Sequence, residues 1–284
     1  PPAWVPASAV SYSQLSCDLG AAYGRIKAIV TQAFPEQARY FGIAEMQLFG
    51  FAQASLEDVL SSLGTQHTMA TFAVQIEAAD DTMPQRPEVV ALVWQLADEQ
   101  IWKNIFKAAA PWVKNLPNGE VSDEQGYSGF RFASEDSHAA VFLGNGNLVL
   151  VVGPGMVETV LSALNDPPEG SDAYRESEVF QNAAGLLPSE SGIGFSITDG
   201  NEYAVVLRDW MVAMIGNFEK MRETMYAADD LEDDEDLWAL GLMKKLMPND
   251  EEIENILGIS ATSYEVDDAG LQLFSVQELP PPQE

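Results

Sequence analysis

A run of acidic residues between positions 229 and 236 contains the densest group of side chains that could bind a ligand. Seven of its eight residues are carboxylates, namely Asp229, Asp230, Glu232, Asp233, Asp234, Glu235 and Asp236. Carboxylate oxygens are the ligands that hard cations such as calcium prefer. The run lacks the alternating ligand spacing and the turn glycine of an EF-hand loop. It therefore predicts either a calcium site or, more simply, loose association of cations with a solvated acidic loop.

A second group of candidate residues is apolar. A helix predicted over 203–226, together with the segment after it, places large side chains at helical spacing: Trp210, Met214, Phe218, Met221, Trp238 and Met243. Methionine-rich helices adapt to varied apolar partners, so these residues predict a groove for a lipid or a partner helix. The same pattern is also typical of ordinary core residues, which is the more common interpretation.

Residue types that commonly act in catalysis are few in this sequence. His67 and His138 are the only histidines, and Cys17 is the only cysteine. A zinc site would need ligands from distant segments, and the single cysteine excludes a disulfide within the chain. No nucleophile elbow or phosphate-binding loop is present, since the Gly-Pro-Gly sequence at 153–155 lacks the lysine that phosphate binding normally adds. We therefore expect no enzymatic activity and no cofactor other than calcium, with an uncharacterised hydrolase as one alternative.

The charge of the chain limits its partners. The 284 residues include 14 basic and 44 acidic side chains, a formal net charge of −30. Such an excess repels nucleic acid and anionic membrane surfaces alike. No run of about 18 apolar residues occurs, so the sequence predicts no transmembrane segment.

The elements that position these residues alternate along the chain. Hydrophobic periodicity and turn residues predict strands over 9–17, 68–76, 89–96, 129–134, 139–143 and 147–152. Helices are predicted over 19–34, 36–51, 55–63, 99–114 and 154–164, the first with Asp18 as its N-cap and the last opened by Pro154. Gly144-Asn145-Gly146 is typical of a hairpin turn.

Parts of the sequence occur twice in the same order. Residues 6–18 resemble residues 188–199, and each segment precedes a long helix. Residues 58–64 resemble residues 253–258, and each segment precedes a strand-rich stretch. This internal repeat predicts an α+β fold with two related halves, each with a strand, a long helix and an antiparallel sheet. The first half spans residues 1–187, and the second, shorter half spans 188–284 and contains the acidic insertion.

The first 200 residues also resemble a known family. The segments 91–98, 126–130 and 140–153, followed by Ser177-Glu178-Val179-Phe180, are similar to exported bacterial α/β proteins that are catalogued only as a domain of unknown function. The resemblance covers most of residues 6–200 and rests on structural patterns, not on a catalytic signature. It implies an envelope or surface location and an α/β fold, and it implies no activity. The acidic insertion departs from the pattern.

These observations lead to ranked hypotheses. The first is a non-enzymatic exported protein, periplasmic or at the cell surface, that binds or assembles with protein partners, including copies of itself. The proline-rich ends agree with a chain cut from, or tethered to, a longer precursor. The alternative is a periplasmic carrier of an apolar ligand held between helices and sheet, which requires a cavity of about 300 Å³ or more.

Overall fold

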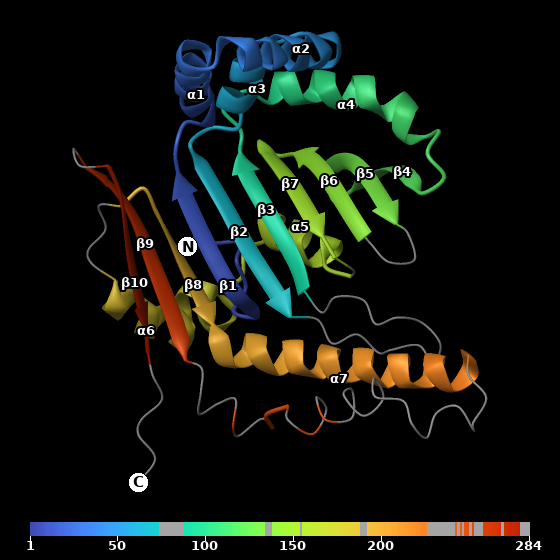
Figure 1. Ribbon diagram of the computed structural model, residues 1–284, viewed down its shortest axis with the longest axis vertical. Coiled ribbons are helices and arrows are strands. Elements are labelled where there is room, and N and C mark those ends of the chain that lie inside the picture. Colours follow the sequence, from blue (N-terminus) through green and yellow to red (C-terminus); the bar gives the residue numbers. More distant parts are fainter. Residues whose placement is uncertain are drawn as a thin grey trace.

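The computed structural model describes residues 1–73, 88–133, 138–153, 155–187, 192–225, 242, 245, 247–249, 252, 258–267 and 270–278. Within these residues the chain forms an α+β fold around one continuous antiparallel sheet of ten strands, in the order β10-β9-β8-β1-β2-β3-β7-β6-β5-β4. The predicted α+β class is therefore confirmed. Figure 1 shows α5 and α6 behind the sheet, α1 to α4 across one end of the strands, and α7 across the other end.

The strands follow the predicted alternation and pair throughout in antiparallel register. Their bounds are β1 Ala9–Ser16, β2 Gln66–Ala73, β3 Glu88–Gln95, β4 Gly119–Glu124, β5 Tyr127–Ala133, β6 His138–Gly144, β7 Asn147–Val152, β8 Gly194–Asp199, β9 Ile259–Asp267 and β10 Gly270–Gln277. Asn145 and Gly146 form the turn between β6 and β7 with φ of 51° and 75°. Positive φ at both positions is the backbone of a tight hairpin turn, so the predicted hairpin is confirmed.

Several of the helices, among them α1 and α3, begin at a residue whose side chain caps them. The helix bounds are α1 Leu19–Ala33, α2 Pro35–Ala52, α3 Leu56–Ser62, α4 Glu99–Val113, α5 Val157–Asn165, α6 Glu178–Leu186 and α7 Gly200–Met225, with short 3₁₀ turns η1 Gly170–Asp172 and η2 Tyr174–Glu176. The Asp18 carboxylate accepts from the Ala21 N–H, as predicted. Ser55 and Asp58 form a reciprocal capping box at α3, which satisfies N–H groups that a helix start leaves unpaired.

One face of the sheet contains the main core, because α5, α6 and η2 cover it. Tyr12 of β1 is fully buried there, with its ring centroid 5.8 Å from that of Tyr174 and 5.6 Å from that of Phe195. We call this side the covered face. Its buried residues include Phe72, Phe142, Val149, Val151, Val160, Leu161, Ala183 and Ile197.

Three elements differ from the sequence predictions. The strand β4 was not predicted, because its sequence GEVSDE is acidic and has a single large apolar residue. The helix α6 was not predicted either, although Ser177 caps it by accepting from the Phe180 N–H. Pro154 does not open α5, which begins at Val157 after Met156. Pro154 itself lies outside the described residues.

Arg131 of β5 joins three elements on the covered face. Its Nε donates to Glu124 Oε1 of β4 at 2.7 Å, and its Nη2 donates to Glu124 and to Glu158 Oε1 of α5, the latter at 2.7 Å. The Arg131 hydrogen bond, aided by one from Ser122, holds the pKa of Glu124 below its usual value. A two-pronged pair of this kind is stronger than an ordinary surface ion pair.

Replacing Arg131 with glutamine should therefore lower the free energy of unfolding by about 1–2 kcal/mol. The lowered pKa of Glu124 means that its contribution is complete above the unfolded value of about 4.3 and is lost as pH falls through the folded value. Urea unfolding of both proteins should show a constant difference from neutral pH to about pH 5 and a narrowing difference below about pH 4. The control is Arg175→Gln, because Arg175 pairs with Glu176 at 3.6 Å and both side chains are half-exposed. Equal losses for the two variants would contradict the assignment.

Candidate functional site

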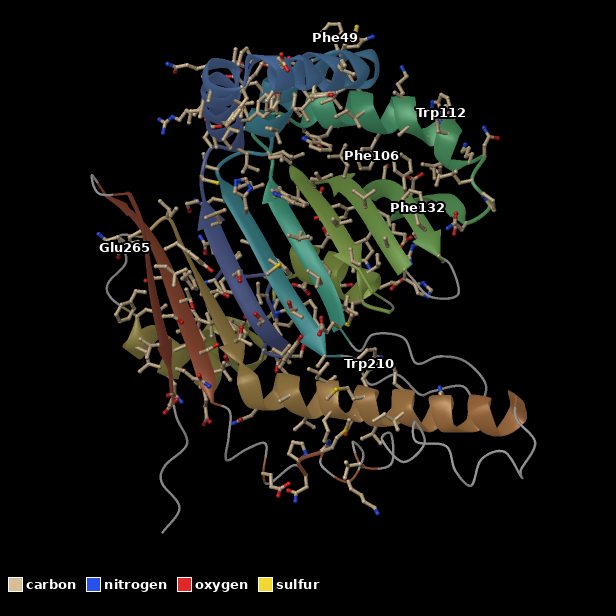
Figure 2. The ribbon with its side chains drawn as sticks, viewed as in Figure 1. Phe49, Phe106, Trp112, Phe132, Trp210 and Glu265 are labelled. Carbon is tan, nitrogen blue, oxygen red and sulfur yellow. The ribbon has the colours of Figure 1, made fainter. Side chains whose placement is uncertain are left out.

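The helices α1, α2 and α4 form a layer whose apolar side chains are largely exposed. We call nine of these residues the apolar helical layer. They are 46–71% exposed and comprise Ile26, Ile29, Phe34, Tyr40, Ile43, Met46, Phe49, Trp112 and Leu116. Ile26 and Phe34, which recur at helical spacing in the sequence, are both more than half exposed. Figure 2 shows Phe49 on α2 and Trp112 on α4 at this end of the molecule.

Polar contacts hold the layer together. The Tyr23 hydroxyl of α1 donates to Glu45 Oε1 of α2 at 3.0 Å, and Lys27 Nζ donates to the same oxygen at 2.5 Å. Desolvation and the Glu45 hydrogen bond raise the pKa of Tyr23 to about 12. At the base of the layer, Trp102 Nε1 of α4 donates to Ser62 Oγ of α3 at 2.9 Å. The arrangement of the helices is therefore fixed although their apolar side chains are exposed.

A cavity of about 540 Å³ lies between α6 and the covered face of β1, β8 and β9. Its apolar walls include Phe180 and Leu187 at α6, and Phe195 and Ile197 of β8. This volume exceeds the minimum that the carrier hypothesis requires. The cavity lies at α6, however, and not at the predicted groove of α7.

The polar groups of this cavity are not all paired within the protein. Gln14 accepts from the Tyr12 hydroxyl at 2.8 Å and donates to Gln66, whose own amide donates to Ser16 Oγ at 2.9 Å. Burial raises the pKa of Tyr12 well above its usual range, so this hydroxyl remains a donor. Ser263 Oγ, by contrast, is buried and has no hydrogen-bond partner in the described part of the chain.

The residues predicted for a groove are only partly described. Trp210 and Met214 lie on α7 and are half-buried, and Figure 2 places Trp210 on the side of α7 nearest the sheet. The side chains of Phe218 and Met221 on the same helix lie outside the described part, as do Trp238 and Met243. α7 itself is attached to the sheet through the Tyr203 hydroxyl, which donates to Glu88 of β3.

The acidic run Asp229–Asp236 lies outside the described residues, so calcium binding there stays a prediction. Elsewhere in the described part of the chain, no group of three or more His, Cys, Asp or Glu side chains is placed to hold a metal ion. Nor is any helix within the described ranges both long and apolar enough to cross a membrane.

The two histidines have different surroundings. His67 Nε2 lies 2.8 Å from the Cys17 carbonyl oxygen, and its Nδ1 is buried without a partner. His138 lines a cleft of about 250 Å³ together with Glu120 and Arg131. No hydrogen bond between His138 and Glu120 is present among the described residues. Neither histidine is therefore arranged as a general base with a carboxylate partner.

The cavity has little signal in the sequence, because its walls come from five segments distributed between Pro1 and Glu265. One usable signal lies in β9, where the small residues Ala261 and Ser263 stand at alternate positions, a spacing that places them on one face of a strand. For the apolar helical layer, the signal in the sequence was the large number of apolar residues in α1, α2 and α4, more than the sheet could bury. Periodicity alone does not reveal which side of a helix is exposed.

Comparison with known proteins adds little to this geometry. No protein-family model and no curated protein matches the sequence, which is consistent with an uncharacterised family. Among solved structures, the chain is similar to that titled crystal form III of TP0453, with 11% identity and a TM-score of 0.44. The match covers 100% of this chain and 81% of the other. A likeness at this level supports no statement about function.

Cys17 allows a direct test of the local electrostatics, because it is the only cysteine. Burial and the neighbouring Asp18 carboxylate raise its pKa. Since the thiolate is the reactive form, the reaction with Ellman's reagent at pH 8 should be slower than that of free cysteine.

Replacing Asp18 with asparagine should accelerate this reaction by about twofold, because asparagine retains the helix cap and removes the charge. Asp98→Asn at the N-cap of α4 is the matched control and should leave the rate unchanged. Rates equal to that of free cysteine would contradict the environment described.

Proposed function

We propose that the chain is a non-enzymatic protein that assembles with protein partners, and that the apolar helical layer is its docking surface. The observation that carries this proposal is the exposure of nine large apolar side chains, seven on α1, α2 and α4 and two, Phe34 and Leu116, at the ends of these helices. Monomeric proteins rarely expose contiguous apolar surface of this extent without an interaction to cover it. The partner we propose is a second copy of the chain, placed layer against layer.

The charge distribution favours this arrangement. The helices α1, α2 and α4 carry five basic residues and three acidic ones, in a chain with 44 acidic and 14 basic residues. Two copies repel each other strongly wherever their acidic surfaces meet. Contact between the two helical layers brings together the least acidic surfaces and holds the acidic parts apart.

The size of the layer also fits. Nine half-exposed large side chains contribute roughly 100 Å² each, which is on the order of the 800 Å² per partner of a standard interface. The aromatic members Phe34, Tyr40, Phe49 and Trp112 are of the kind that dominates binding energy at interfaces.

An exported location in the cell envelope is part of the same proposal. It rests on the resemblance of residues 6–200 to exported bacterial proteins.

We also propose that residues 1–187 and 188–284 are related by duplication. The sheet order supports this relation, because β3-β2-β1 and β8-β9-β10 extend in opposite directions from the β1–β8 pair. In each set a strand leads into helix, and the chain then returns as two antiparallel strands.

Self-assembly should be detectable by sedimentation velocity at protein concentrations of roughly 1 to 100 µM. Proteins with interfaces of standard size commonly associate in this range. We expect a concentration-dependent increase to dimer mass for the natural sequence. Met46→Glu and Ile29→Glu should each weaken the association by about tenfold or more, because a charge is then desolvated in the interface. Both positions are exposed, so the free energy of unfolding should change by less than about 0.5 kcal/mol.

The matched control is Leu273→Glu, which introduces the same charge at a side chain of β10 that is 63% exposed. This variant should associate like the natural sequence. A chain that stays monomeric throughout the range, or an equal effect at Leu273, would overturn the assignment of the helical layer.

Calcium dependence is a separate prediction of the acidic run. The same measurement in calcium and in chelator should show tighter association with calcium if Asp229–Asp236 binds the ion. Asp233→Asn combined with Asp234→Asn should remove the difference, and magnesium should not reproduce it. If the protein has the same mass in calcium and in chelator, the acidic run associates with cations only loosely.

A further inference from the structure

The cavity between α6 and the sheet contains a polar atom whose hydrogen-bonding capacity the protein does not use. Ser263 is only 5% exposed, and its Oγ has no hydrogen-bond partner among the residues that the structure describes. Strand pairing places Ser263 beside Phe195 of β8 and Phe274 of β10. Phe195 also lines the cavity, so the hydroxyl lies on the cavity side of the sheet. A buried hydroxyl without a partner destabilises a folded protein unless a ligand or water satisfies it.

The remainder of the cavity is suited to an apolar body. Phe180 and Leu187 at α6 oppose Phe195 and Ile197 of β8. The volume of about 540 Å³ lies within the range of pockets that enclose small molecules. A few placed polar groups on an apolar lining is the usual composition of such sites.

The charged groups that line the cavity determine which head group an apolar ligand can have. Burial lowers the pKa of the Pro1 α-amino group, which also lines the cavity, so at pH 8 the main charge among the described lining residues belongs to Glu265. Its carboxylate, in a chain of net charge −30, opposes an anionic head group. A hydroxyl or ester oxygen, in contrast, can exchange a hydrogen bond with Ser263 at no cost in buried charge.

We propose that this cavity binds a neutral amphiphile, with an uncharged oxygen bonded to Ser263 and an apolar chain packed between α6 and β8. The site is separate from the apolar helical layer. The proposal therefore does not depend on self-assembly, and the two tests can fail independently.

The experiment is a competition assay with the fluorescent apolar probe N-phenyl-1-naphthylamine, using 1-decanol and decanoate at pH 8 as competitors. The two competitors share a ten-carbon chain and differ in the charge of the head group. We expect 1-decanol to displace the probe, and decanoate to bind roughly tenfold more weakly because its charge must be desolvated beside Glu265. Glu265→Gln should narrow this difference.

Ser263→Ala separates ligand binding from folding. Removing an unpaired buried hydroxyl should leave the melting temperature of the ligand-free protein unchanged or higher, while the Kd for 1-decanol rises roughly fivefold or more. Ser260→Ala is the matched control, because Ser260 lies on the same strand and faces the opposite side of the sheet. It should not change the affinity.

Three results would overturn the proposal. The first is a natural sequence that does not bind 1-decanol. The second is decanoate binding as tight as that of 1-decanol. The third is an equal affinity of Ser263→Ala and Ser260→Ala for 1-decanol.

Discussion

The antiparallel pairing of β1 with β8 is the contact on which the sheet depends. β1 pairs with β2 along one edge and with β8 along the other, and these strands form the centre of the ten-stranded order. Side chains reinforce the pairing, since Ser13 donates to Ser196 at 2.7 Å and the hydroxyls of Ser11 and Thr198 lie 3.0 Å apart. Without this pair, the sheet would separate into sets of three and seven strands.

The same pair determines where the two proposed binding regions lie. The cavity needs β1, β8 and β9 side by side, because its floor is formed by residues from all three strands. The apolar helical layer lies at the end of the strands where β1 leads into α1. Figure 1 shows these regions in different parts of the molecule, with α6 behind the sheet and α1 and α2 across its end. A ligand in the cavity and a partner on the layer therefore do not compete for the same surface.

Local structure was largely predictable from this sequence, because its signals are local. Asp18 and Ser55 cap helices, Asn145-Gly146 forms a hairpin turn, and alternation marks most strands. β4 escaped prediction because three of its six residues are acidic and only Val121 is a large apolar residue, so this edge strand has almost no hydrophobic signal. The cavity escaped because no period in the sequence relates Phe180 to Ser263. The exposure of Ile26 could not be predicted either, because a helical period identifies a face and not what covers it.

The position of β1 also has a consequence for the synthesis of the protein. β1 leaves the ribosome before the other described strands of this sheet, yet its partner β8 on one edge follows more than 170 residues later. At roughly 5–20 residues per second, that edge stays unpaired for about 10–35 seconds. An open central strand is a template for pairing with other chains. β1 has small hydroxyl side chains at Ser11, Ser13 and Ser16. During that interval they favour association with other chains less than large apolar side chains would.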